Sequence, residues 1–408
     1  MTRFSKQIKS YRQQLGTVMR NEFHAVFSDE GALLILVFAL IIYATAYSLA
    51  YGSQVLRDVP IGVIDESRTA ASRSLIQTFN AGPNTYVAYN PTSMEEAREL
   101  FYGRRIYGVV YIPESYERDL LGGSQANVAI YADASYFLMY RQVFQELVIT
   151  IGKTGAMVEF QRLIAKGANI PQAQATVQPV IYEAHNLFNP YLGYATFVMP
   201  AIIMVIIQQT LLIGIGMVGG TWREFGLYHK LCPPGRRRMS TLPVVVGRAL
   251  VYGGIYAVTS TYILALHYRL FHYPMNGATG TVVLFMLCYL AACIALGIAL
   301  STLFRYRENS LLLLLWTSIP LLMLSGVSYP REGIPDWLFT LGQIFPSSHG
   351  VAGFIRIQSM GASTGEVFGE IKMLVILTVV YGGLAAIGTH QVIGRELRER
   401  ATTCLRKP

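Results

Sequence analysis

The sequence carries little charge: only 14% of its 408 residues are Asp, Glu, Lys or Arg, whereas 52% are hydrophobic. Soluble domains have about 25% charged residues, so the composition excludes an ordinary water-soluble enzyme. Six apolar runs are each long enough to cross the ~30 Å hydrocarbon core of a membrane as a helix. They are residues 32–51, 197–219, 249–267, 281–303, 311–329 and 373–390. The sequence predicts an α-helical membrane protein with six transmembrane helices.

Several catalytic motifs are missing as well. No glycine-rich loop ends in Gly-Lys-Ser/Thr, so the chain is not expected to hydrolyse ATP by itself. The seven histidines and four cysteines are scattered, which predicts no metal site. Ser347, Ser348 and His349 lie between a proline and a glycine, and we interpret them as a turn rather than a hydrolase site. We predict a non-catalytic chain with no cofactor of its own.

The six runs contain no Asp, Glu, Lys or Arg, which disfavours a proton- or sodium-coupled transporter. Arg248 and Lys372 lie one residue outside the third and sixth runs, where their side chains can reach the membrane surface. The polar residues within the runs are uncharged and form a candidate substrate pathway. We assign to it Thr45, Ser48, Gln208, Gln209, Ser318 and Ser325. The two glutamines fit either interhelical hydrogen bonding or a pathway or subunit-interface role.

Lys and Arg are unevenly placed. They gather in residues 1–31, 220–247 and 392–408. The short segments expected on the other side, 268–280 and 330–371, hold only three of them. Because cytoplasmic loops carry the excess of basic residues, both termini are predicted in the cytoplasm. No basic stripe for nucleic acid is present in the long segment 52–196, whose charge is nearly balanced.

The N-terminal 31 residues are predicted to form a cytoplasmic amphipathic helix at the membrane interface. Its apolar positions recur every three or four residues, opposite basic side chains. They are Ile8, Tyr11, Leu15, Met19, Phe23 and Val26. Residues 48–50 resemble a signal-peptide cleavage site, but the polar segment before the first run and the run itself are too long for a signal sequence. We therefore expect residues 32–51 to be an uncleaved span.

Residues 52–196 are predicted to form a mixed α/β domain outside the cytoplasm. Short β-branched or aromatic runs alternate with helical periodicity. The predicted strands are 61–65, 86–90, 107–113 and 127–133, and the predicted helices are 67–80, 93–103 and 114–121. Residues 135–166 lack proline and indicate a long helix that either packs on the sheet or rises from the membrane. The segment has no cysteine and must fold without disulfides.

The segment after the fifth run is broken by prolines, and its apolar stretch 337–345 is too short to cross a membrane. It predicts a re-entrant or interfacial hairpin within residues 330–371, on the outer side. The residues assigned to this hairpin are Pro330, Pro335, Trp337, Pro346 and Arg356.

Three passages, 187–204, 221–250 and 324–361, resemble the membrane subunit of ABC-type-2 exporters. The first has an Asn-Pro turn followed by aromatic residues and a proline just inside the span. The second contains Arg223-Glu224 and Gly226, a partial match to the family's cytoplasmic loop. The third has, in order, the Ser-Gly, the Tyr-Pro, the Pro-x-Trp, a second Pro and an Arg before a Gly that are found in the family's segment after span five. The layout before residue 187 fits the subset of the family with a large external domain between spans one and two.

The resemblance implies that a separate cytoplasmic ATPase, which holds ATP and magnesium, drives this chain. The loop 220–247 is then the candidate coupling element. Its candidate contacts are Arg223, Glu224, Pro233, Pro234, Arg236, Arg237 and Arg238. The arginine triplet fits equally well a simple anchor on the cytoplasmic side. A second copy or a sister permease would complete the path, with spans one, two and five central.

The sequence thus predicts the permease subunit of an ATP-driven exporter of hydrophobic or amphiphilic substrates, in a bacterial inner membrane. Spans two to six and their loops would occupy residues 197–391, with a basic tail at 392–408. Expected partners are ABC ATPase subunits, a second permease, membrane lipids and plausibly a membrane-fusion adaptor with an outer-membrane duct. The alternatives are a structural or receptor-like membrane protein and a secondary transporter.

Overall fold

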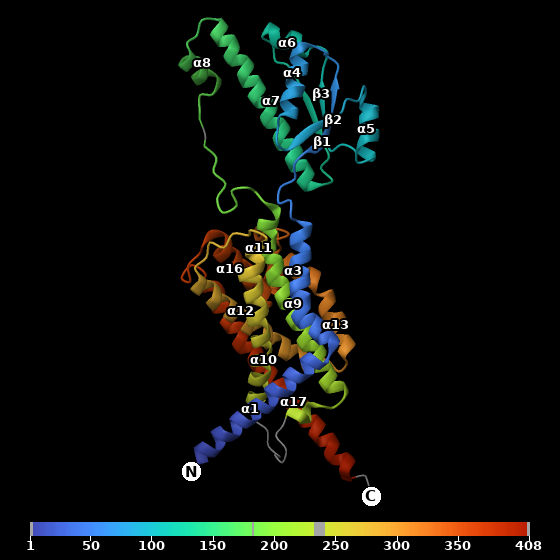
Figure 1. Ribbon diagram of the computed structural model, residues 1–408, viewed down its shortest axis with the longest axis vertical. Helices are drawn as coiled ribbons and strands as arrows, with labels where there is room; N and C mark the ends of the chain where they lie inside the picture. Colours follow the sequence, from blue (N-terminus) through green and yellow to red (C-terminus); the bar gives the residue numbers. More distant parts are fainter. Residues whose placement is uncertain (1–2, 182, 232–240, 406–408) are drawn as a thin grey trace. The chain divides into compact units, whose positions relative to one another are not determined.

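The computed structural model describes residues 3–181, 183–231 and 241–405, and the chain divides into two compact units (Figure 1). One unit is helical and comprises Met1–Gly52 and Leu187–Pro408; the other comprises Ser53–Asn186 and is α/β. Each has a hydrophobic core of its own.

Five helical stretches in the described part of the chain are long and apolar enough to cross a membrane. They are Glu30–Ala50, Tyr194–Glu224, Thr241–Leu270, Thr279–Ser301 and Phe368–Glu399. The first stretch consists of α2 (Glu30–Leu33), the π-helical turn η1 (Leu34–Phe38) and α3 (Ala39–Ala50), and the second is α9 (Tyr194–Glu224). The third consists of α10 (Thr241–Thr261), the π-helical turn η3 (Tyr262–His267) and α11 (Tyr268–Leu270). The fourth is α12 (Thr279–Ser301), and the fifth is most of α17 (Phe368–Leu405). Five of the six predicted runs therefore form helices of spanning length.

The sixth predicted run, 311–329, is not one continuous helix. It is divided into α13 (Arg307–Trp316) and α14 (Ser318–Leu324), with the break at Thr317. Pro320 supplies the physical reason, because it has no N–H to donate to the carbonyl of Trp316 four residues earlier, and its ring crowds that carbonyl. Neither piece alone reaches spanning length.

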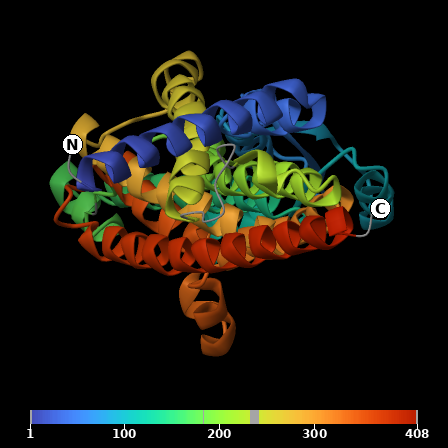
Figure 2. The ribbon, with the colours of Figure 1, turned by 90° about the horizontal axis from the view of Figure 1, so that it is seen from below.

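One long N-terminal helix and several shorter elements complete the helical unit. They are α1 (Arg3–Ser28), the 3-10 turns η2 (Tyr228–Leu231) and η4 (Arg331–Gly333), α15 (Asp336–Gly342) and α16 (Pro346–Met360). Seen from below, α1 (blue) and α17 (red) cross the view with the yellow-green end of α9 between them (Figure 2). α9 lies in the middle, packed against α3, α12, α13 and α16, and it is buried along most of its length.

Glycines on α9 allow its neighbours to approach closely. A Cβ on Gly214 would meet the side chain of Leu36 at 2.3 Å, and one on Gly220 would meet the backbone of Arg307 at 2.9 Å. Side chains at these two positions would therefore push η1 and α13 away from α9.

α1 is amphipathic, but its inward face differs from the predicted one. Gln14, Val18, Glu22 and Val26 are buried, at four-residue steps, where α1 packs on α10. Phe23, predicted to be on the same face as Val26, is exposed and stacks on Phe27 at 4.3 Å between ring centroids. One side of α1 thus joins the helical core, while Phe23 and Phe27 stay exposed on another side.

The α/β unit holds a four-stranded sheet of order β2-β1-β3-β4 (Figure 1). The strands are β1 (Val59–Asp65), β2 (Thr85–Tyr89), β3 (Gly108–Ile112) and β4 (Ala129–Ala132). β1 pairs in parallel with β2 and β3, whereas β4 is antiparallel to β3. Every strand overlaps a predicted one, so the mixed α/β prediction for this segment is confirmed at the level of secondary structure.

Helices cover both faces of this sheet. α4 (Ala70–Asn80) and α7 (Phe137–Ala165) pack on one face, and α5 (Met94–Tyr102) packs on the other. α6 (Tyr116–Gly122) follows β3, and α8 (Ile170–Val177) follows α7. Of the two alternatives for the long helix, packing on the sheet is the observed one: a Cβ on Gly108 of β3 would lie 2.5 Å from Val143 of α7.

Candidate functional site

A fully buried ion pair joins α1 to α10. Arg248 Nε donates to Glu22 Oε1 at 2.8 Å, and neither side chain is exposed. The hydroxyl of Tyr252 donates to the same carboxylate oxygen at 2.5 Å, and Arg248 Nη1 donates to Ser301 Oγ of α12 at 3.3 Å. Separating the two helices would leave each charge without its partner, and an uncompensated buried charge is strongly destabilising. The pair therefore fixes the position of α1 on α10.

The predicted placement of Arg248 at the membrane surface is therefore wrong. α10 begins at Thr241, eight positions earlier than the apolar run, so Arg248 lies two turns inside the helix. The prediction assumed that water at the membrane surface solvates the Arg248 guanidinium, whereas in the structure the Glu22 carboxylate takes the place of that water. The signal for Glu22 was present in the sequence, because it is the only acidic residue among the first 28 and it lies four residues from both Val18 and Val26. Lys372 is exposed.

A second ion pair fixes the start of α2 to the start of α13. Both Nη atoms of Arg307 donate to the carboxylate of Asp29, Nη2 to Oδ1 at 2.8 Å. Asp29 also caps α2 by accepting the backbone N–H of Ala32 at 3.0 Å. Partial burial by itself would raise the pKa of Asp29, but the hydrogen bonds from Arg307 and the backbone outweigh it and lower that pKa. The carboxylate therefore stays charged at neutral pH.

The turn η2, directly after α9, is held from two sides. Glu396 of α17 accepts the backbone N–H groups of Tyr228 and His229 at 3.1 and 3.3 Å, and lies 2.9 Å from His229 Nδ1. Asn21 of α1 donates to the backbone carbonyl of Lys230 at 2.7 Å. Tyr228 is buried, which raises its pKa. η2 thus bridges the N-terminal helix and the C-terminal helix.

The predicted coupling residues fall into three groups. Arg223, in the last turn of α9, points into the unit and donates to the carbonyl of Thr302 at 2.6 Å. Glu224, the final residue of α9, is exposed. The remaining predicted contacts lie outside the described residues: Pro233, Pro234, Arg236, Arg237 and Arg238.

The two glutamines of the predicted pathway have different surroundings. Gln208 Oε1 accepts the backbone N–H of Ser347, the second residue of α16, at 2.7 Å, so it caps the start of another helix. Gln209 is 6% exposed, and within the described structure neither its Oε1 nor its Nε2 has a hydrogen-bond partner. Gln208 joins two helices of the same subunit, while Gln209 is an unsatisfied amide.

Three of the other predicted pathway residues, all serines, have hydrogen-bond partners other than the glutamines. Ser48 is buried and accepts from Tyr273 at 3.0 Å, with His267 Nε2 at 3.2 Å. Ser318 donates to the carbonyl of Leu314 in α13, across the break, and Ser325 donates to the carbonyl of Leu322 in α14. Thr45 is half-buried on α3. These four residues thus lie on α3 and on α14 with its C-terminal cap.

The hairpin segment consists of η4, α15 and α16. Pro335 precedes the first residue of α15, Pro346 is the first residue of α16, and Pro330 precedes η4. Trp337 is 70% exposed. Arg356 of α16 donates to Glu370 of α17 at 2.8 Å, which joins the end of the hairpin to the last long helix.

The turn predicted at residues 347–349 is wrong. Ser347, Ser348 and His349 form the first turn of α16 and are buried. Pro346 explains the difference, because a proline is well suited to the first position of a helix, where no N–H is needed. Ser348 Oγ donates to the carbonyl of Gly342 at 2.7 Å, which closes α16 onto α15.

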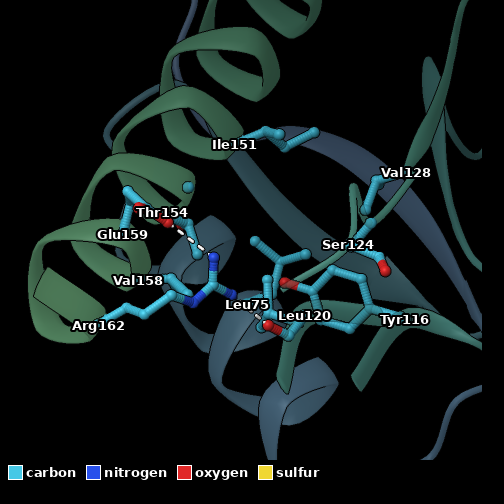
Figure 3. Close-up of a pocket in the computed structure, with 12 residues that line it drawn as sticks. Leu75, Tyr116, Leu120, Ser124, Val128, Ile151, Thr154, Val158, Glu159 and Arg162 are labelled. Carbon is cyan, nitrogen blue, oxygen red and sulfur yellow. Dashed lines mark hydrogen bonds and ion pairs between the residues drawn. The ribbon is translucent and has the colours of Figure 1, made fainter. Parts of the chain in front are cut away.

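The α/β unit contains a small cavity of about 200 Å³ between α4, α6 and α7 (Figure 3). Leu75, Leu120 and Ile151 contribute apolar walls. At one end Arg162 donates to Glu159 at 2.7 Å and to the carbonyl of Leu120 at 2.5 Å, so its charge is used within the fold. Among the described residues of the whole chain, no group of His, Cys, Asp or Glu could hold a metal ion.

The fold is that of a multi-pass helical membrane protein with an inserted α/β unit, and a profile of the ABC-2 family transporter proteins matches residues 31–387. The chain belongs to this family. It is 23% identical to the probable multidrug ABC transporter permease YbhR of Escherichia coli K12 over 384 residues, 91% of this chain and 97% of the relative. It is 24% identical to the inner membrane transport permease YhhJ of the same strain over 386 residues, 91% and 96% of the two chains.

A third relative, ABC transporter G family member 20 of Dictyostelium discoideum, is 23% identical over 348 residues, 84% of this chain but 44% of that protein. The predicted permease role in an ABC transporter is therefore confirmed, and the receptor-like and secondary-transporter alternatives lose their support. Membership in the family implies an ATP-binding partner subunit.

Proposed function

We propose that this chain is the permease of an ATP-driven exporter in a bacterial inner membrane, with both termini in the cytoplasm and the α/β unit on the outer side. The placement of Lys and Arg supports this orientation. α13 and α14 together would act as the sixth span, crossing as a broken helix whose freed backbone groups are satisfied within the protein. The chain itself would be non-catalytic, with ATP and magnesium held by the partner.

One observation supports the proposed coupling mechanism: both α1 and α17 hydrogen-bond to η2, close to the end of the buried helix α9. A force that the ATPase applies to the segment after α9 would therefore displace η2, α1 and α17 together, instead of deforming only a flexible loop. The buried pair of Glu22 and Arg248 would extend the same movement to α10. We propose that ATPase movements enter the permease through this cluster.

The test uses the permease reconstituted with its ATPase, with ATP hydrolysis and transport measured in parallel. Glu396→Gln weakens the hydrogen bonds between α17 and η2 without changing the size of the side chain. We expect transport to fall several-fold while ATP hydrolysis continues. Glu30→Gln, at an exposed carboxylate of α2, is the control and should behave like wild type. Wild-type coupling in Glu396→Gln would contradict the mechanism.

Docking of the ATPase is tested separately. Reversing the charge of Arg236, Arg237 and Arg238 should reduce co-purification of the ATPase and make the remainder more sensitive to salt, because salt screens exposed ion pairs. Unchanged binding would reduce the triplet to an anchor on the cytoplasmic side. Membrane insertion, measured as the yield of folded permease, has to be preserved for either result to count.

The substrate is proposed to be hydrophobic or amphiphilic. The predicted spans contain no charged residue, and the relative YbhR is described as a probable multidrug permease. A second permease copy or a sister permease would complete the path. The α/β unit would offer a surface for a membrane-fusion adaptor and, through it, an outer-membrane duct.

A further inference from the structure

The entry loop, Leu187–Gly193, leads directly into α9 and displays large hydrophobic side chains. Four of its seven residues are of this kind, and all four are exposed. They are Leu187 (72% exposed), Phe188 (47%), Tyr191 (87%) and Leu192 (43%). No Asp, Glu, Lys or Arg occurs between Glu183 and Arg223, so the loop is as free of charge as the span that follows it. Contiguous exposed apolar surface of this kind marks a contact with something other than water.

Hydrogen bonds hold the entry loop in its shape. Asn189 Nδ2 donates to the carbonyl of Gly193 at 3.0 Å, and the N–H of Gly193 donates to Asn189 Oδ1 at 3.1 Å. Phe188 and Leu192 have φ angles of 65° and 53°, in the left-handed region that bulky side chains rarely adopt. Such conformations persist only where the surrounding structure imposes them. The exposed side chains are therefore presented by a defined turn.

The length of α9 indicates where the entry loop lies. α9 has 31 residues and is roughly 46 Å long at 1.5 Å per residue. A bilayer with its headgroup regions is about 40–45 Å thick. With Arg223 and Glu224 of the last turn at one membrane surface, Tyr194 at the start of α9 reaches the headgroup region of the other.

Aromatic side chains mark the same level on the neighbouring span. The ring of Tyr194 meets that of Tyr51, directly after α3, edge to face at 5.2 Å between centroids, and Tyr51 stacks on Tyr47 at 6.1 Å. Tyrosine is enriched where the hydrocarbon core meets the headgroups. Exposed apolar side chains continue into both spans, with Leu49 in the last turn of α3 and Phe197 in the first turn of α9. The entry loop thus extends the exposed apolar surface of two spans.

We propose that the entry loop binds the phospholipid surface of the leaflet at which α9 begins. A protein partner would need polar groups to fix its orientation. The polar side-chain groups of the loop are the Asn189 amide, which is used within the loop, and the Tyr191 hydroxyl. A lipid interface requires no such groups, since an apolar body with a polar tip suits it.

The contact has a consequence for the chain. The α/β unit ends at Asn186, so the point at which the chain returns from that unit is held at the membrane surface. The inference depends neither on the exporter proposal nor on which side of the membrane is cytoplasmic.

Spin labels test the contact in the full-length chain, reconstituted in vesicles of phosphatidylethanolamine and phosphatidylglycerol. A nitroxide is attached at Tyr191→Cys in a background whose four native cysteines are alanine. Its collisions with oxygen, which concentrates in lipid, and with a polar nickel complex, which lipid excludes, are measured. Tyr102→Cys is the matched control, because Tyr102 is 80% exposed on the charged helix α5. We expect about threefold fewer nickel collisions at Tyr191 than at Tyr102, with no fewer oxygen collisions.

Two further measurements complete the test. Asn189→Ala, added to Tyr191→Cys, removes both hydrogen bonds to Gly193 and should raise the nickel collisions about twofold, toward the Tyr102 value. A benzophenone amino acid, incorporated at Tyr191 in the chain with its native cysteines, should form phospholipid adducts on illumination, detected by mass spectrometry. This second measurement does not depend on the folding of the cysteine-free background.

Three results would overturn the proposal. Equal nickel collisions at Tyr191 and Tyr102 would place the loop in water. Few collisions with either reagent, together with a photo-cross-link between two permease chains, would make the loop a subunit interface. Unchanged collisions in Asn189→Ala would show that the turn does not hold the loop at the lipid surface.

Discussion

α9 and the α13–α14 pair were both predicted to line the transport path, yet their surroundings are opposite. In the most apolar part of α9, 94% of the residues are buried, enclosed by helices of the same subunit. α13 and α14 instead expose a row of large side chains. They are Leu312, Leu313, Leu315, Trp316, Ile319 and Met323. An uncharged polar residue in a predicted span therefore does not reveal whether its side chain faces the transport path, another helix or lipid.

The composition of the two segments explains the contrast. α9 carries glycines where neighbours touch it, so other helices approach its backbone. α13 carries a run of leucines and α14 follows a proline-induced break, which suits a surface facing lipid or a second permease. A path between two permeases can therefore be lined directly by α13 and α14. It can reach α9 only if the helices around α9 separate.

The largest expected effect comes from placing a carboxylate on each segment. Gln209→Glu puts a charge in a buried, unpartnered position of α9, at a cost of about 3 kcal/mol in a membrane interior. Ser318→Glu puts the same charge on the half-buried start of α14. Size-exclusion profiles of the two variants should show loss of folded Gln209→Glu and near-normal Ser318→Glu. Normal yield of Gln209→Glu would mean that α9 faces a wet cavity.

The next effect concerns the contact between the two segments. Gly220→Ala places a Cβ 2.9 Å from the Cα of Arg307, so the backbone of α13 has to move. Overpacking of this kind costs about 1–3 kcal/mol, and the thermal unfolding midpoint should fall. Gly254→Ala on α10 meets nothing within 4 Å and should be neutral or slightly stabilising. Equal midpoints for the two variants would show that α9 and α13 do not touch as described.

A smaller effect is expected for Gln208→Leu. The substitution leaves the backbone N–H of Ser347 without its acceptor and should cost about 1 kcal/mol. Hydrogen exchange should show faster opening of the first turn of α16, while α9 itself stays protected. Unaltered exchange there would indicate that water or another group replaces the amide.

Gln209→Leu should have the smallest effect. Its amide has no partner within the described structure, so no hydrogen bond is lost and stability should change by less than about 0.5 kcal/mol. Thermal unfolding and export are measured together. A variant that is fully stable but exports poorly would assign Gln209 to substrate contact and would weaken the contrast between the two segments.

Patterns of local sequence predicted much of this architecture. The strands and helices of the α/β unit follow alternating and helical periodicity, and five apolar runs became helices of spanning length. Two local errors came from proline, which broke the run at Pro320 and started a helix at Pro346. What sequence could not provide were partners far apart in the chain. Glu22 with Arg248 and Gln208 with Ser347 depend on which helices pack together.

The buried pair also sets an order of events during synthesis. Glu22 and Arg248 are separated by 226 residues. At about 5–20 residues per second, the ribosome needs roughly 11–45 s to reach the arginine after making the glutamate. During that interval the Glu22 carboxylate of α1 has no buried donor and stays hydrated. α1 therefore docks on α10 only after the third spanning stretch has begun to enter the membrane.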